Sequence, residues 1–85
     1  MDAGVSHRFT RTRYRAGYSM ADVDAFFDRV EATLGLRPRY GPPVTAADVA
    51  AAQFRIVRVR AGYDPREVDE ALDRYEERLR EQGWE

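Results

Sequence analysis

The chain has 85 residues, of which 44% are apolar, 34% are charged and 12% are aromatic, which suits a single domain with one small core. It has no cysteine, which excludes disulfides and thiolate metal sites, and its net charge of −1 gives no sign of a nucleic-acid tail. No stretch approaches the roughly 20 apolar residues that span a bilayer, and no apolar run marks the N-terminus, so we expect a cytoplasmic protein.

The chain contains an internal repeat with an offset of 45 residues. Residues 9–34 align with residues 54–79, and twelve of the 26 aligned pairs are identical. Two copies are too few for a solenoid, so we expect them to pack on each other about a pseudo-twofold axis. Residues 1–85 would then form one domain, in which a Gly/Pro connector and a short helix, residues 35–53, join the repeats.

Each copy begins with a segment that predicts a short β-strand. Arginine alternates with threonine and tyrosine through residues 10–15, and apolar residues interleave with arginine through residues 55–60. We expect residues 9–15 to pair with residues 54–60 as a two-stranded ribbon. Gly17 and Gly62 would end these strands at a turn whose φ disfavours a side chain.

Capping residues predict a helix after each of these glycines. Ser19 and Asp64 have the side chains of N-caps, and Asp22 and Glu67, three residues later, would complete capping boxes. Pro65 suits the first helical position of the second copy. We therefore expect one helix in each copy.

Apolar residues then recur at i, i+3, i+4, i+7 and i+11, so each helix has one apolar face. These helices should cover about residues 19–34 and 65–82, and a third, short helix should run from Thr45 to about Gln53. The sequence thus predicts a mainly α fold (α+β) with a small two-stranded ribbon. The predicted core consists of Phe9, Tyr18, Val23, Phe26, Phe27, Val30, Leu34, Val49, Phe54, Tyr63, Val68, Leu72, Tyr75 and Leu79.

Both copies carry the motif Gly-Tyr-x-x-x-x-Val-Asp. The tyrosine before each cap should pack on the valine as a hydrophobic staple. The aspartate should accept hydrogen bonds from strand arginines such as Arg13, or from their counterparts across the interface between the copies. The motif residues are Gly17, Tyr18, Val23 and Asp24 in the first copy and Gly62, Tyr63, Val68 and Asp69 in the second.

This motif, with the runs Thr45-Ala46-Ala47-Asp48-Val49 and Gly62-Tyr63-Asp64-Pro65-Arg66-Glu67-Val68-Asp69, resembles the N-terminal domain of DivIVA-type proteins, especially the short DivIVA-like repeats of high-GC Gram-positive bacteria. The resemblance covers residues 9 to about 77. It implies a non-catalytic module of cell-division or polar-growth scaffolds, located at the membrane, pole or septum. It implies no cofactor, and it implies a protein partner such as a longer DivIVA-type scaffold.

The resemblance also implies a lipid contact. In the family, an exposed apolar residue and an arginine just before Gly-Tyr touch the membrane, and the matching residues are Tyr14 with Arg15 and Val59 with Arg60. An extra alanine intervenes in both copies. One copy would contribute ~4 to 5 kcal/mol of membrane binding, a dissociation constant on the order of millimolar, so we expect weak peripheral contact. The family's long coiled coil is not expected, since apolar positions continue for only about two heptads.

A ribbon-helix-helix DNA-binding regulator is the alternative, because an arginine-rich strand precedes a capped helix. The acidic second half of the chain, ten acids against seven arginines in residues 44–85, opposes phosphate binding. We therefore expect no nucleic-acid partner.

The sequence offers few residues that could serve in catalysis. His7 is the only histidine, and the paired aspartates of each helix simply repeat along one face, so we predict no enzyme, no metal site and no cofactor. Trp84 is either a terminal packing contact or an exposed docking residue. The sequence is compatible with a monomer or a homodimer, and with repeats that pair within one chain or swap between chains.

Overall fold

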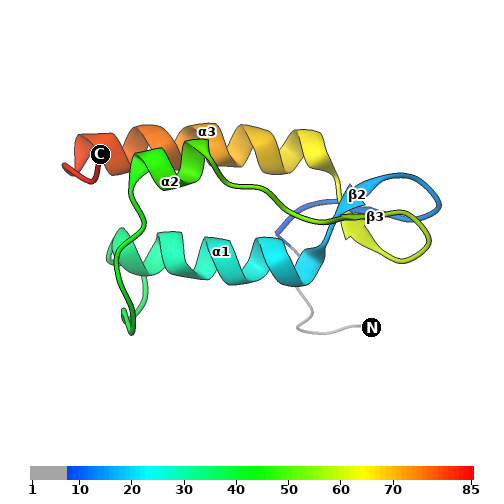
Figure 1. Cartoon of the computed structure of the whole chain (residues 1–85), viewed down its shortest axis with the longest axis horizontal. Coiled ribbons are helices and arrows are strands. Elements are labelled where there is room, and N and C mark those ends of the chain that lie inside the picture. Colours follow the sequence, from blue (N-terminus) through cyan, green and yellow to red (C-terminus); the bar gives the residue numbers. More distant parts are fainter. Residues whose placement is uncertain (1–7) are drawn as a thin grey trace.

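Three helices and a four-stranded antiparallel sheet make up the α+β fold of the computed structural model, which describes residues 8–85 (Figure 1). Helices α1 and α3 lie side by side and run in the same direction away from the sheet, while α2 lies against α3 (Figure 1). His7 lies outside the described residues. The elements in chain order are β1 (Arg11–Thr12), β2 (Gly17–Tyr18), α1 (Met20–Thr33), α2 (Ala46–Ala50), β3 (Ile56–Val57), β4 (Gly62–Tyr63) and α3 (Pro65–Glu81).

The two long helices begin at their predicted caps. The Ser19 hydroxyl accepts a hydrogen bond from the Asp22 N–H at 3.3 Å, and the Asp64 carboxylate accepts one from the Arg66 N–H at 2.9 Å. The bounds of α1 and α3 therefore agree with the prediction to within one residue at each end. The short helix α2 has the predicted start but ends at Ala50, three residues early.

The predicted capping boxes of α1 and α3 are wrong. Asp22 accepts hydrogen bonds from the N–H and the guanidinium of Arg55, each at 3.1 Å. Glu67 accepts them from the N–H of Thr10 at 2.7 Å and from its hydroxyl at 2.9 Å. Both acids thus hold the strand segment of the other repeat. Among the described helices, the reciprocal box forms at α2, between Thr45 and Asp48.

The predicted ribbon is also wrong. Strand β1 pairs with β4 and β3 pairs with β2, while Tyr18 and Tyr63 meet at the centre, so the sheet order is β1-β4-β2-β3. The physical reason lies in residues 13–15 and 58–60, which bend and return the chain instead of extending the strands. Strands β1 and β3 consequently lie at opposite edges of the sheet.

The contacts around the sheet recur with the same offset of 45 residues. Arg11 lies opposite Tyr63 in the β1–β4 pair, and Ile56 lies opposite Tyr18 in the β3–β2 pair. Beyond each pair, the N–H of the helix cap donates to the carbonyl of residue 55 or residue 10, both at 2.8 Å. Each repeat therefore completes its backbone hydrogen bonds on the other repeat.

The core lies between α1 and α3 in two adjoining clusters. The cluster nearer the sheet contains Val23, Phe27, Tyr63, Val68 and Ala71. The cluster at the far end contains Val30, Leu34, Val44, Ala46, Val49 and Leu79, and Trp84 packs against it. The Trp84 carbonyl also accepts the Ala46 N–H at 2.7 Å, so Trp84 is a terminal packing contact.

Six predicted core residues are only partly buried, because they pack at the rims of the clusters. The Phe9 ring, for example, meets the Phe27 and Tyr63 rings edge-on at 5.5 and 5.3 Å. Two small residues that the predicted core omits are buried, Ala46 and Ala71, although the helical periodicity of the second copy includes Ala71. The six are Phe9, Tyr18, Phe26, Phe54, Leu72 and Tyr75. No helix within residues 8–85 combines the length and apolarity needed to cross a membrane.

Candidate interaction sites

Residues 13–15 and 58–60 form two loops, here called the twin loops, which project beyond the sheet at the end away from the C-terminus (Figure 1). Each tip carries one large side chain that is almost fully exposed. Tyr14 is 82% exposed and Val59 is 83% exposed. Ala16 and Ala61, which follow the loops, are half-buried, whereas residues 13–15 and 58–60 are exposed.

The glycines of the motif set the position of the twin loops by close approach at the sheet centre. A Cβ on Gly62 would lie 2.8 Å from Val57 Cγ2 and 2.9 Å from the Tyr18 carbonyl oxygen. A Cβ on Gly17 would overlap the Thr12 hydroxyl and lie 3.1 Å from the Tyr63 carbonyl oxygen. Neither glycine has a left-handed φ, so the predicted turn was the wrong reason for glycine here.

Backbone conformation distinguishes the two tips. Tyr14 has a φ of 68°, in the left-handed region that few non-glycine residues adopt, whereas Val59 does not. A β-branched side chain resists this region most strongly, which accounts for the difference. The two loops therefore present different side chains on different backbones.

Unpaired positive charge surrounds both tips. Five exposed arginines lie on β1 and the twin loops, and none forms an ion pair with another of residues 8–85. Arg55 differs, because it binds Asp22, and its hydrogen bonds lower the pKa of the Asp22 carboxyl. This end of the molecule is thus both basic and apolar. The five arginines are Arg11, Arg13, Arg15, Arg58 and Arg60.

The aspartates of the motif bind tyrosines and not the strand arginines that the sequence predicted. The Tyr63 hydroxyl donates to Asp24 at 2.8 Å, and the Tyr18 hydroxyl donates to Asp69 at 3.0 Å. Burial raises the pKa of both tyrosines, and the hydrogen bonds to the carboxylates raise it further. The motif therefore links the two repeats twice, while Arg13 and its counterparts stay in solvent.

Arg8 was missed by sequence reasoning. Its guanidinium binds Asp24 at 2.9 Å, Asp28 at 2.6 Å and Glu31 at 3.2 Å. Burial alone lowers the pKa of Arg8, but the hydrogen bonds to the aspartates and the charge of Glu31 raise it overall. The aligned residue in the second repeat is Gln53, so the repeat gave no signal for this contact.

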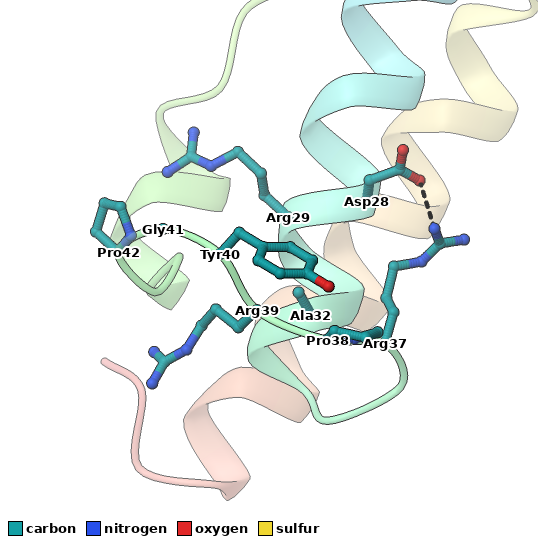
Figure 2. Close-up of a pocket in the computed structure, with 9 residues that line it drawn as sticks. All are labelled: Asp28, Arg29, Ala32, Arg37, Pro38, Arg39, Tyr40, Gly41 and Pro42. Carbon is teal, nitrogen blue, oxygen red and sulfur yellow. Dashed lines mark ion pairs between the residues drawn. The ribbon is translucent and has the colours of Figure 1, made fainter.

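A cleft of about 430 Å³ at the opposite end was also missed. It lies between α1 and the connector and is here called the connector cleft (Figure 2). Tyr40, 94% exposed, contributes an aromatic ring to its lining. The sequence predicts only a Gly/Pro connector for this segment. The lining residues are Asp28, Arg29, Ala32, Arg37, Pro38, Arg39, Tyr40, Gly41 and Pro42.

Neither site holds the residues of a metal centre: within the described part of the chain, no three histidine, aspartate or glutamate side chains are grouped to hold an ion. The chain was compared with protein-family models, curated proteins and solved structures. It matches none of them.

Proposed function

We propose that the protein is a non-catalytic, DivIVA-like adaptor for bacterial cell-division or polar-growth scaffolds. Its twin loops touch an anionic membrane surface weakly, and another part of the molecule binds a protein partner such as a longer DivIVA-type scaffold. On this proposal it acts in the cytoplasm at the membrane, pole or septum.

We also propose that the repeats are related by a pseudo-twofold axis. The two repeats of one chain would then pack on each other as the two subunits of a homodimer do. The paired contacts support this proposal. Tyr18 with Asp69 and Tyr63 with Asp24 are equivalent after the 45-residue shift. Such an axis would place both loops at one end of the molecule.

The observation that carries the membrane proposal is that both tips project from the same end. Tyr14 and Val59 would enter the lipid headgroup region together, while the five unpaired arginines meet anionic headgroups. An apolar side chain surrounded by free guanidinium groups suits the membrane interface, where anionic headgroups lie next to hydrocarbon. Burial at this interface removes the apolar side chain from water.

The free energy of membrane binding is larger when both loops contact the membrane together. Each arginine contributes about 1 kcal/mol near an anionic leaflet, and each inserted side chain about 1 to 2 kcal/mol. The total of about 8 kcal/mol corresponds to a dissociation constant on the order of micromolar. One copy alone would bind only in the millimolar range, so the pairing of the loops is what makes the contact useful.

The DNA-binding alternative loses its geometric basis in this fold. It requires two paired strands that enter the major groove together. Here β1 and β3 lie at opposite edges of the sheet, each beside the Gly-Tyr of the other repeat. We therefore do not propose it, and DNA serves as an arm of the test.

Flotation with vesicles tests the proposal. The protein should float with phosphatidylglycerol-containing vesicles at low salt and remain in the soluble fraction with phosphatidylcholine alone, because the arginines need anionic headgroups. A double variant, Arg15→Ser with Arg60→Ser, should lose flotation. The matched control, Arg74→Ser with Arg78→Ser on exposed α3 positions, has the same net charge and should float.

Equal flotation with both lipids, or loss of flotation in both double variants, would contradict the membrane contact. Tight binding to a duplex DNA with no flotation would support the DNA-binding alternative. Pull-down from a related bacterial cytoplasm tests the partner: recovery of a division or polar-growth scaffold is expected, and its absence would contradict the adaptor role.

A further inference from the structure

The connector cleft combines apolar walls with two free positive charges. Ala32 on α1 and the prolines of the connector supply apolar surface, and in the view of Figure 2 the Tyr40 ring extends from the connector toward Ala32. The residues that line the cleft belong to the C-terminal half of α1 and to the connector, and these segments lie away from the twin loops (Figure 1). A ligand there would not compete with a membrane for the same surface.

The charges that line the cleft are not equivalent. Arg37 is neutralised, since its guanidinium lies 3.1 Å from Glu31 and 3.6 Å from Asp28. Arg29 and Arg39 form no ion pair with any other of residues 8–85. In Figure 2 these two side chains extend on the side of Pro42, away from the Arg37–Asp28 pair. One side of the cleft is therefore positive.

The Arg39 side chain is held in place by the Trp84 ring. Its guanidinium lies over the Trp84 ring, 5.6 Å from the ring centroid, and Trp84 packs against the far-end core cluster. This cation–π contact leaves the N–H groups at the guanidinium edge free to donate hydrogen bonds. Less conformational entropy is then lost when Arg39 binds an anion.

We propose that the connector cleft binds an acidic peptide segment of a partner protein. An apolar side chain of the peptide would pack against Ala32, Pro38 and the Tyr40 ring, and flanking carboxylates would accept hydrogen bonds from Arg29 and Arg39. This inference rests on the proposed adaptor function and names the surface for its protein partner. The partner and the membrane would then lie at opposite ends of the molecule.

An acidic peptide fits this cleft better than a nucleic acid does. Nucleic-acid affinity comes mainly from basic side chains that neutralise several phosphates, whereas only two guanidinium groups of this cleft are free. Asp28 also lines the cleft, but its carboxylate is paired with Arg8 and Arg37 and so does not offset the charges of Arg29 and Arg39. A peptide with a few carboxylates around one apolar side chain matches two cations beside an apolar wall.

Fluorescence anisotropy tests this proposal with the labelled pentapeptide Glu-Glu-Phe-Glu-Glu as the probe. The protein should bind it saturably and bind Glu-Glu-Ser-Glu-Glu and Lys-Lys-Phe-Lys-Lys more weakly. Arg29→Glu should weaken binding by about tenfold or more, since it removes a charge-assisted hydrogen bond and adds a repulsive charge. Arg74→Glu is the matched control, because the repeat aligns it with Arg29 and it lies outside the cleft; its affinity should be unchanged.

Three results would overturn the cleft proposal: no saturable binding of the probe, equal affinity for the lysine peptide or for oligothymidine, or equal losses in the two arginine variants. Both substituted positions are exposed, so the fold should survive. The two proposals fail separately. If the protein floats with anionic vesicles but does not bind the probe, only the cleft proposal is contradicted. If it binds the probe but does not float, only the membrane proposal is contradicted.

Discussion

Gly17 and Gly62 place the twin loops because the two chain segments cross where neither can carry a side chain. The nearest groups to a Cβ on Gly62 are a carbonyl oxygen and a backbone carbon at 2.9 and 3.1 Å, in addition to Val57. Backbone atoms cannot rotate away as the end of a flexible side chain can. A side chain at Gly62 would therefore lower the free energy of unfolding, because the backbone of the crossing segment would have to move.

Gly62→Ala should destabilise the protein by about 1 to 3 kcal/mol, the usual cost of overpacking. Gly41→Ala is the matched control, because a Cβ there meets nothing within 4 Å and its φ is not left-handed. This control should change the free energy of unfolding by less than about 0.5 kcal/mol. Urea denaturation measures both, and equal effects of the two substitutions would contradict the close crossing.

Elements of different repeats are tied together by the tyrosine–aspartate hydrogen bonds. The Tyr63 hydroxyl links β4 to α1, and the Tyr18 hydroxyl links β2 to α3. Tyr63 is 2% exposed, so its hydroxyl depends on Asp24 for a partner, and Asp24 in turn is held by Arg8. The helices are thus fixed to the sheet at the end that carries the twin loops.

Tyr63→Phe should cost about 1 kcal/mol at pH 8, because Arg8 still pairs Asp24 and leaves no orphaned carboxylate. In the native protein the pKa of Tyr63 is raised above its unfolded value near 10. The neutral hydroxyl therefore contributes its full stability below about pH 10 and loses it as the pH rises through the folded pKa. In the variant, stability should fall less steeply with pH in this alkaline range.

Denaturation at a series of pH values tests this result, with Tyr40→Phe as the control. Tyr40 is almost fully exposed and makes no side-chain hydrogen bond within the described residues, so its replacement should leave stability unchanged. An unaltered alkaline slope in Tyr63→Phe would show that the hydroxyl does not couple the elements.

Local signals predicted the elements, and contacts between distant residues escaped prediction. The starts of α1 and α3 were predicted because Ser19 and Asp64 bind N–H groups three and two residues away. The partners of Asp22 and Glu67 were not, because these acids reach across the sequence to the other repeat. The strand pairing failed for the same reason, since two-residue strands carry too little alternation to set a register.

Of the two candidate sites, the sequence predicted the twin-loop residues but not the connector cleft. The resemblance indicated Tyr14 and Val59, and the fold exposes both at one end. The connector cleft was not predicted, because the residues between α1 and α2 have no periodicity and their arrangement depends on where the two helices lie. Arg29 carried no signal of its own, since an exposed arginine on a helix is usually solvated.

On the scale of the whole molecule, large exposed apolar side chains gather at two opposite ends. Tyr14, Val59 and the half-exposed Ile56 lie at the sheet end, and Leu36 and Tyr40 lie on the connector. Unpaired arginines accompany both groups. The helices between them hold the core and keep the two ends apart, so the proposed membrane contact and the proposed peptide site do not overlap.

The central claim is that both loops of one chain act as a single contact. Titration with anionic vesicles of Tyr14→Ser, Val59→Ser and the double variant tests it most directly, with Leu36→Ser at the opposite end as the control. Each single variant should bind about tenfold more weakly and the double variant about a hundredfold, because each inserted side chain contributes about 1 to 2 kcal/mol. Unchanged binding in either single variant, or an equal loss in Leu36→Ser, would contradict the claim.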